Sequence, residues 1–506
     1  MSNTFMNGLQ STTNFTHTDN GALAHKSTGS KVYDMFALGG AYRRRSDEDT
    51  ILLFKNAYEE DPTLALKCLF YLRDCRGGQG ERRFFRVAFR WLCSYDKAAA
   101  RRNLIHLSEY GRWDDLIYCT IGTPIENDAF KIVHEQLILD LASKTPSLLG
   151  KWMPSENASS ATTKNTANTL RIYLGLTHRH YRKLLSELRK RINIVERLMS
   201  ENRWDEIEFD KIPSRAGLIY KNAFARRDII AKKYETFAKS ESTTVNAKTL
   251  FPYEVVAKAT NTGSKWGYNF NSLSDVDRVM IEKYWNNLPD YLHGDPCKMM
   301  CVVDTSGSMT GTSADAPLNV AISLGMYCAE RIGGPFKDHY ISFSSEPQLI
   351  KIEGVDFVDK VRRIYRTNLC ENTNINATFD MLLNVARHSR LEDIPETIVI
   401  ISDMQIDSGA YSCYNSRSDS WRIWTQATAM TEMEAIRAKW ASYGIKCPKL
   451  VYWNVNASNN TILDAGPNVT FVSGCSPTIF EQVITGVTGY DLMMKKLMSA
   501  RYEVIN

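Results

Sequence analysis

The feature that most constrains the fold is a change of pattern after residue 290, where helical periodicity gives way to alternating strand-like and helix-like segments. Four short runs are rich in apolar and β-branched residues: "KMMCVVD" (298–304), "DHYISFS" (338–344), "ETIVIISD" (396–403) and "KLVYWNV" (449–455). Helix-like segments lie between them. Strands that alternate with helices of this size form right-handed crossovers and a parallel sheet. The pattern predicts a doubly wound α/β domain over residues 291–506.

Before that point the chain has helical periodicity. Segments such as "DPTLALKCLFYLRDC" and "HRHYRKLLSELRKRINIVERLM" carry apolar residues at three- and four-residue spacing, with short polar connectors between them. Paired helices of this length predict an α-helical, HEAT-like repeat region over residues 47–290. Residues 154–169 and 240–247 break the pattern, and we expect them to be loops. The first 46 residues lack a secretory signal and predict a polar, mobile tail.

Length and composition support a multidomain protein of the α and α/β classes. A chain of 506 residues is too long for one ordinary core, so two or three domains are expected. No apolar run is long enough to span a bilayer, which argues against a membrane protein. The 11 cysteines form no CxxC pair. This usage indicates reduced thiols and a cytoplasmic location.

Charge is distributed unevenly along the chain. Residues 1–296 contain 43 Lys and Arg against 35 Asp and Glu, whereas residues 297–506 contain 19 against 22. Basic excess favours a polyanion partner for the first part and not for the second.

Oxygen-bearing side chains follow two of the predicted strands. Asp304 ends the first strand, Ser306 and Ser308 follow it at alternate positions, and Asp403 ends the third. Thr373 lies in the loop before the intervening helix and adds a further hydroxyl group. Ligands bind at the carboxyl ends of strands in such sheets. Carboxylate and hydroxyl oxygens suit Mg²⁺ or Mn²⁺ and not zinc. The alternative is that Asp304 only caps a turn.

The same five residues, in the same order, resemble the metal-ion-dependent adhesion site of von Willebrand factor A domains. The resemblance implies a Rossmann-like von Willebrand factor A fold. In that family the carboxylates contact the metal partly through water, and one position is left for an acidic group of a protein partner. The implied role is binding and not catalysis.

Basic residues cluster on two predicted helices. Arg82, Arg86 and Arg90 recur every fourth residue, and Arg73 and Arg76 lie just before them. The second cluster consists of Arg179, Arg182, Lys183, Arg189 and Lys190. Several guanidinium groups on one face bind phosphate in a salt-sensitive manner. The alternative is that these arginines pair with acidic residues of neighbouring helices.

Phrases in the helical part, including "YLRDCRGGQGERRFF" and "DKIPSRAGLIYKNAFARRD", resemble the helical (TROVE) region of Ro ribonucleoproteins. They resemble more closely an uncharacterised family that joins such a region to a von Willebrand factor A domain, and that likeness covers most of the chain. In Ro proteins the helices form a ring that binds small structured RNA and single-stranded RNA ends.

These features together predict an intracellular RNA-binding protein and not an enzyme. In this hypothesis the arginine stripes bind phosphates and the second half holds Mg²⁺ or Mn²⁺. The alternative is an adaptor that docks an acidic protein partner at the metal site without nucleic acid. No P-loop and no HExxH motif is present, which excludes a P-loop ATPase and an HExxH metalloprotease. A metal-dependent phosphohydrolase would lack a nucleophile. Oligomeric state is not predicted.

Overall fold

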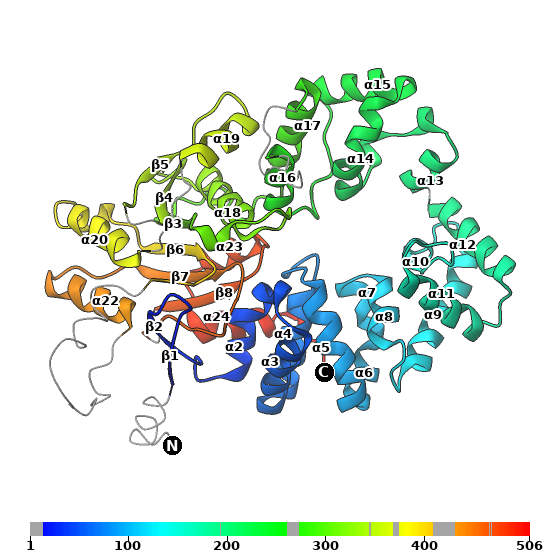
Figure 1. The fold of residues 1–506 in the computed structure, drawn as a ribbon, viewed down its shortest axis with the longest axis horizontal. Coiled ribbons are helices and arrows are strands. Elements are labelled where there is room, and N and C mark those ends of the chain that lie inside the picture. Colours follow the sequence, from blue (N-terminus) through cyan, green and yellow to red (C-terminus); the bar gives the residue numbers. More distant parts are fainter. Residues whose placement is uncertain are drawn as a thin grey trace. The chain divides into compact units, whose positions relative to one another are not determined.

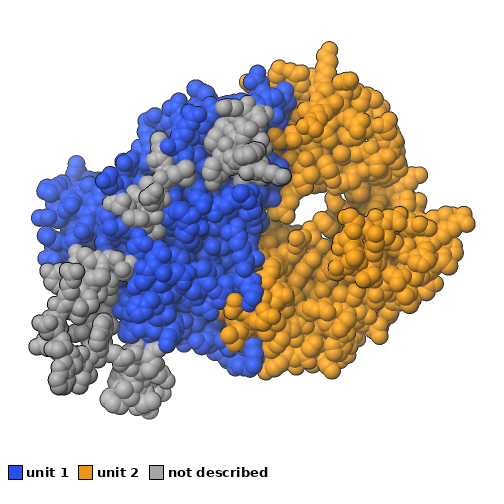
Figure 2. Space-filling model, in the orientation of Figure 1, with its two compact units in different colours: residues 1–46, 55–61, 250–497 blue, residues 47–54, 62–249, 498–506 orange. Residues whose placement is uncertain are grey.

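The computed structural model describes residues 14–192, 194–260, 273–343, 346–367, 374–407, 431–464, 466 and 468–506. The chain divides into two compact units, drawn in different colours in Figure 2. Unit 1 comprises residues 1–46, 55–61 and 250–497, and unit 2 comprises residues 47–54, 62–249 and 498–506. Unit 1 contains the sheet and unit 2 is helical, so the predicted combination of a helical part and an α/β part is confirmed.

Unit 2 is a succession of short and medium helices (Figure 1). They are α3 (Asp47–Glu60, whose last turns belong to unit 1), α4 (Pro62–Arg73), α5 (Arg82–Tyr95), α6 (Lys97–Asn103), α7 (Leu107–Tyr110), α8 (Trp113–Thr120), α9 (Glu126–Ala142), α10 (Leu149–Trp152), α11 (Ala161–Tyr173), α12 (His178–Ile192), α13 (Val195–Ser200), α14 (Ser214–Arg226) and α15 (Asp228–Lys239).

One of the two predicted loops is wrong. Residues 240–247 contain no helix or strand, but the second half of 154–169 lies in helix α11. Ser160 caps that helix by accepting a hydrogen bond from the Thr163 N–H at 3.3 Å. Ala167 and Leu170 of this helix are fully buried. Packing of these two residues outweighs the low helix propensity of the surrounding threonines and asparagines.

The six-stranded sheet of unit 1 has the order β5-β4-β3-β6-β7-β8, with only the short edge strand β5 antiparallel (Figure 1). Its strands are β3 (Met299–Asp304), β4 (His339–Phe343), β5 (Leu349–Lys351), β6 (Thr397–Ser402), β7 (Lys449–Asn454) and β8 (Val469–Ser473). The order of connection reverses between β3 and β6, as in a doubly wound sheet. The four predicted strands are therefore confirmed.

Helices and one hairpin complete unit 1. The helices are α2 (Lys31–Leu38), α16 (Pro252–Ala259), α17 (Asp275–Asn286), α18 (Pro317–Arg331), α19 (Phe357–Thr367), α20 (Ile375–Ala386), α22 (Glu432–Ser442), α23 (Thr478–Val483) and α24 (Gly489–Leu497), and the hairpin pairs β1 (Phe15–His17) with β2 (Leu23–His25). Helix α18 packs tightly on β3, because a Cβ added at Gly325 would lie 2.5 Å from Cγ2 of Val303.

The expected mobile tail is wrong for residues 14–46. Residues 32–38 of helix α2 are buried, and the Phe471 N–H of strand β8 donates to the Tyr33 hydroxyl at 3.0 Å. The Gly40 N–H donates to Ser473 Oγ at 2.9 Å. The apolar sequence "KVYDMFALGGAY" accounts for this packing, whereas the polar residues 1–13 lie outside the described part.

The predicted domain boundary near residue 290 also differs from the structure, because helices α16 and α17 belong to unit 1. Trp285 of α17 stacks on Phe357 of α19 with ring centroids 4.4 Å apart. Its indole N–H donates to Glu330 of α18 at 2.6 Å. These contacts pack helix α17, which was predicted to belong to the helical region, against the α/β core.

Two further observations concern membrane-spanning segments and cysteines. No helix in the described ranges is both long and apolar enough to cross a membrane. The nine cysteines within those ranges are all free thiols.

Candidate cation site and basic surface

The strand order brings Asp304 and Asp403 to the same edge of the sheet. Asp304 ends β3, and Asp403 follows directly after β6, the strand paired with β3 in parallel. Ser402, the last residue of β6, donates a hydrogen bond from its hydroxyl to Oδ2 of Asp304 at 2.5 Å. The predicted meeting of these two strand ends is therefore present in the fold.

Both carboxylates are buried. Asp304 is 0% exposed and Asp403 is 3% exposed. Burial and, secondarily, the charge of Asp403 raise the pKa of Asp304 to about 6. Burial raises the pKa of Asp403 as well, against the opposing effect of hydrogen bonds from the Gln405 N–H and the Ser308 hydroxyl. No Lys or Arg in the described ranges forms an ion pair with either carboxylate.

The loop after β3 places hydroxyl groups beside these carboxylates. The Ser306 N–H donates to Oδ1 of Asp304 at 2.9 Å, and the Ser306 and Ser308 hydroxyl oxygens lie 3.1 Å apart. Thr305, in the same loop, is 1% exposed, and its hydroxyl has no hydrogen-bond partner among the described residues. Thr373, the fifth predicted ligand, lies outside the described residues.

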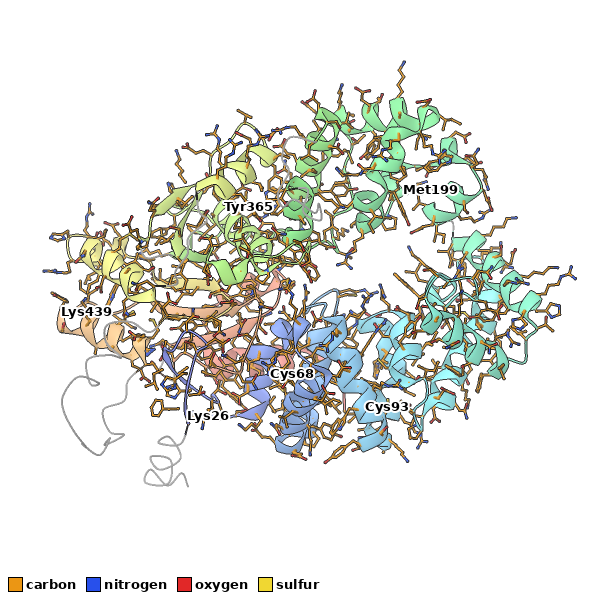
Figure 3. All side chains as sticks on the ribbon, in the orientation of Figure 1. Lys26, Cys68, Cys93, Met199, Tyr365 and Lys439 are labelled. Atoms are coloured by element: carbon orange, nitrogen blue, oxygen red, sulfur yellow. The ribbon has the colours of Figure 1, made fainter. Side chains whose placement is uncertain are left out.

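A second layer of contacts fixes this loop. Tyr365 of helix α19, labelled in Figure 3, donates its hydroxyl hydrogen to Oδ1 of Asn319 in α18. The amide nitrogen of Asn319 donates to the carbonyl oxygens of Ser313 and Ala314 at 3.4 and 3.1 Å. The loop that carries Ser306 and Ser308 is therefore anchored at its far end by two helices.

The chemistry of the donors fits a hard divalent cation. Carboxylate and hydroxyl oxygens are the ligands that Mg²⁺ and Mn²⁺ prefer. Among the residues that the structure describes, no three or more His, Cys, Asp or Glu side chains are grouped to hold a metal ion. The candidate cation site differs from such a group, because it combines the two carboxylates of Asp304 and Asp403 with serine hydroxyl groups.

Sequence reasoning missed one acidic residue at this edge. Asp19 lies in the turn between β1 and β2, and its charge contributes to the raised pKa of Asp403. The sequence signal was "TDNG" (18–21), which favours a tight hairpin turn.

Two arginines of the first stripe that were predicted to bind phosphate, Arg73 and Arg86, form ion pairs inside the protein. Arg73 donates from Nε and Nη2 to Asp115 at 2.9 and 2.6 Å, and Arg86 Nε donates to the same carboxylate at 2.6 Å. Asp115 is 0% exposed. Burial alone would raise its pKa, but the two guanidinium groups outweigh burial and hold the pKa of Asp115 below its usual value.

The other three arginines of the first cluster differ in their exposure and hydrogen bonding. Arg76 donates to the Glu109 carbonyl oxygen, and Arg90 Nη1 donates to the Ile121 carbonyl oxygen at 2.5 Å. Arg82 is exposed at the start of α5. Within the described part of the chain, Arg82 is the one member of the first cluster that is both exposed and not engaged in a hydrogen bond.

Helix α12, labelled in Figure 1, carries the second cluster. Four members of this cluster form an exposed basic face. Its exposed members are Arg179, Arg182, Lys183 and Lys190. They recur at spacings of three, four and seven or eight residues, which places them on one side of the helix. The opposite side buries Tyr181, Leu185 and Leu188. No carboxylate in the described ranges forms an ion pair with these four cations.

Arg189 differs from the other members of this cluster, because its guanidinium group forms hydrogen bonds within the protein. It donates to the carbonyl oxygens of Gly150 at 2.9 Å and Met153 at 3.0 Å, and to Ser155 Oγ at 3.0 Å. The half-buried side chain therefore connects α12 to the region of α10.

Comparison with known proteins gave the following findings. A family model described as a domain of unknown function (DUF2828) matches residues 18–120 and 138–294, and a second (DUF7788) matches residues 298–495. An uncharacterized protein L728 of Acanthamoeba polyphaga mimivirus is 29% identical over 493 residues, covering 89% of this chain and 80% of that protein. The crystal structure of the Deinococcus radiodurans Ro (RSR) protein aligns over 95% of this chain and 100% of that chain, with a TM-score of 0.47 and 14% identity.

Proposed function

The chain belongs to the DUF2828 family, and we propose that it is an RNA-binding protein whose α/β unit holds a divalent cation. The observation that carries the RNA proposal is the unpaired basic face of helix α12. The resemblance of the helical part to Ro ribonucleoproteins, noted from the sequence, points in the same direction. We assign no catalytic step to either unit, and we place the protein in the cytoplasm.

The α12 face has the chemistry of a phosphate-binding surface. Arg179 and Arg182 each offer a planar fork of donors that matches a phosphate, and Lys183 and Lys190 add point charges. Since no described carboxylate neutralises these four groups, RNA phosphates would not have to displace an existing ion pair. Four phosphate contacts predict a slope of about −3 for the logarithm of affinity against the logarithm of salt concentration, since single strands contribute about −0.7 per contact.

The test is RNA binding by the full chain, measured by filter retention of one structured RNA and one single-stranded RNA at low and moderate salt. We expect binding that weakens with the slope given above. A variant in which all four α12 cations are replaced by glutamine should lose most of that affinity.

The matched control replaces four exposed cations that already form ion pairs, namely Lys131, Arg203, Lys211 and Lys239. This control removes the same charge and should retain more affinity. Absence of RNA binding at low salt, or equal losses in the two variants, would contradict the proposal.

For the cation, we infer that Asp304, Ser306, Ser308 and Asp403 would hold Mg²⁺ or Mn²⁺, with Thr373 as the further ligand predicted from the von Willebrand factor A resemblance. The supporting observation is the pair of buried carboxylates, which have no basic partner among the described residues. Burying an uncompensated charge is costly, and a divalent cation would remove that cost. When bound, the cation supplies a positive centre that attracts an acidic group.

The second candidate function follows from this site. An adaptor would use the cation to dock a carboxylate of a protein partner, with the helical unit serving as scaffold. Replacing Asp304 by Ala should then abolish partner capture and leave RNA retention unchanged. Loss of RNA retention in that variant would instead tie the cation to RNA binding.

A further inference from the structure

Helix α10 holds Lys151 and Trp152 next to two other helices of unit 2. It contacts both α8 and α12 (Figure 1). A Cβ added at Gly150 would lie 2.6 Å from Cβ of Leu188 in α12, so the two helices are closely packed. Arg189 of α12 donates to the Gly150 carbonyl oxygen at 2.9 Å. The two residues of α10 are therefore fixed beside the helix that carries the exposed basic face.

Two cationic groups lie against the indole ring of Trp152. The guanidinium carbon of Arg112 is 3.9 Å from the ring centroid, and Nζ of Lys151 is 5.6 Å from it. All three side chains are half-buried, so part of each is open to solvent. The Arg112 guanidinium is fixed in orientation, because it donates to the two carboxylate oxygens of Asp114 at 2.9 and 2.6 Å. A planar cation is thus held over an aromatic ring.

Positive charge exceeds negative charge around this ring. Asp114 also pairs with Arg86 at 2.8 Å. Asp115 pairs with Arg73 and with Arg86, each at 2.6 Å. Three guanidinium groups therefore share two carboxylates, which leaves one positive charge uncompensated. Within the described ranges Lys151 forms no ion pair and adds a second. A contact that only packed α10 against α8 would not need this surplus.

We propose that Trp152 and Arg112 form a subsite for one unpaired RNA base, and that Lys151 contacts the phosphate next to that base. This inference rests on the RNA-binding function proposed above, and it adds a base contact to a face that otherwise binds phosphates. Unpaired bases stack on aromatic rings and on guanidinium planes. The surplus positive charge attracts the phosphate. A base within a duplex is already stacked on its neighbours, so the subsite selects an unpaired nucleotide.

Stacking and phosphate contacts respond differently to salt. Each phosphate contact with a single strand contributes about −0.7 to the salt slope, because it releases counterions. A base stacked on a ring releases none. Loss of one stacking aromatic weakens binding roughly tenfold. Removal of the Trp152 ring should therefore lower the affinity and leave the salt slope unchanged.

The test is binding of the full chain to two labelled probes, measured by fluorescence anisotropy across salt concentrations. One probe is a short oligoadenylate, and the other is an abasic ribose-phosphate oligomer of the same length. We expect Trp152→Leu to raise the Kd for the oligoadenylate roughly tenfold at every salt concentration and to leave the Kd for the abasic oligomer within about twofold. Trp152→Tyr keeps an aromatic ring and should restore most of the affinity. Lys151→Gln should weaken both probes and reduce the magnitude of the salt slope by about 0.7.

The matched control is Trp91→Leu. Trp91 belongs to the same unit, is also half-buried, and stacks on Tyr95 with ring centroids 4.3 Å apart. Its replacement removes an equal ring from another stack and should leave the Kd for both probes unchanged. The melting temperature of each variant shows whether the helical unit remains folded.

The outcomes separate the two proposals. If the wild type binds neither probe at low salt, or the four-glutamine α12 variant binds both as tightly as the wild type does, the RNA-binding function is wrong and the subsite falls with it. If the α12 variant loses affinity but Trp152→Leu binds the oligoadenylate within about twofold of the wild type, the function stands and the subsite is overturned. Equal losses on the two probes, or an equal loss in Trp91→Leu, would assign the effect to packing and would also overturn the subsite.

Discussion

In metal-free buffer at neutral pH, the Asp304→Asn variant should be more stable than the wild type. Burial and the charge of Asp403 raise the pKa of Asp304 from 3.8 to about 6, so the ionised form is disfavoured in the folded chain. A shift of this size corresponds to about 3 kcal/mol at pH 7.5, because each pKa unit is worth about 1.4 kcal/mol. Asparagine keeps an oxygen to accept from the Ser306 N–H and removes the charge.

The dependence on pH follows from the direction of the shift. The pKa of Asp304 is higher in the folded chain than in the unfolded chain. The stability that protonated Asp304 contributes is therefore fully present below pH 3.8 and is lost as the pH rises through 6. The advantage of Asp304→Asn should therefore fall to about half at pH 5. For a unit of about 300 residues, 3 kcal/mol corresponds to about 5 °C in the melting temperature.

The measurement is thermal unfolding followed by circular dichroism in EDTA at pH 7.5 and pH 5. Asp393→Asn is the control, since that carboxylate is exposed, and it should change the melting temperature little. Addition of Mg²⁺ should reverse the order by stabilising only the wild type and the control. If Asp304→Asn is no more stable than the wild type in EDTA at pH 7.5, or gains equally at both pH values, the buried carboxylates are compensated in some other way and the reasoning fails.

Three other outcomes test the helical unit. Asp115→Ala should destabilise unit 2 by about 3–5 kcal/mol, because it leaves the buried guanidinium of Arg73 unpaired, and a lower melting temperature would show it. Gly78→Ala should also lower the melting temperature, since the added Cβ would lie 2.1 Å from the Tyr71 carbonyl oxygen, and an unchanged value would contradict the observed loop. Arg182→Gln should reduce the magnitude of the salt slope of RNA binding by about 0.7, measured by repeating the filter titration across salt concentrations.

Much of the sheet can be predicted from the sequence because its central strands are buried on both faces. Strands β3, β6 and β7 are uninterrupted apolar runs, which is typical of parallel strands beneath helices. Strand β5 has three residues with two of them exposed, so it carries no such signal. The hairpin strands β1 and β2 are equally short, and their pairing depends on contacts with residues almost 400 positions later.

The site was predictable to the extent that it depends on strand ends. Because parallel strands end at one edge, Asp304 and Asp403 are brought together by topology alone. The arginines differ, since helical spacing identifies a stripe but not what the stripe faces. Arg86 lies on such a stripe, yet it faces Asp114 and Asp115 of helix α8, and this pairing depends on tertiary packing.

Several residues of the Ro-like phrase "YLRDCRGGQGERRFF" also make contacts inside the protein. Gly78 approaches the carbonyl oxygen of Tyr71 too closely for any side chain, and Gln79 Nε2 donates to the Tyr71 hydroxyl at 2.6 Å. Asp74 is 0% exposed and accepts from Arg501 Nη2 at 2.7 Å. These polar groups are engaged within unit 2, so they have a role in folding. The direct test of RNA contact therefore belongs to helix α12, where the basic side chains are exposed.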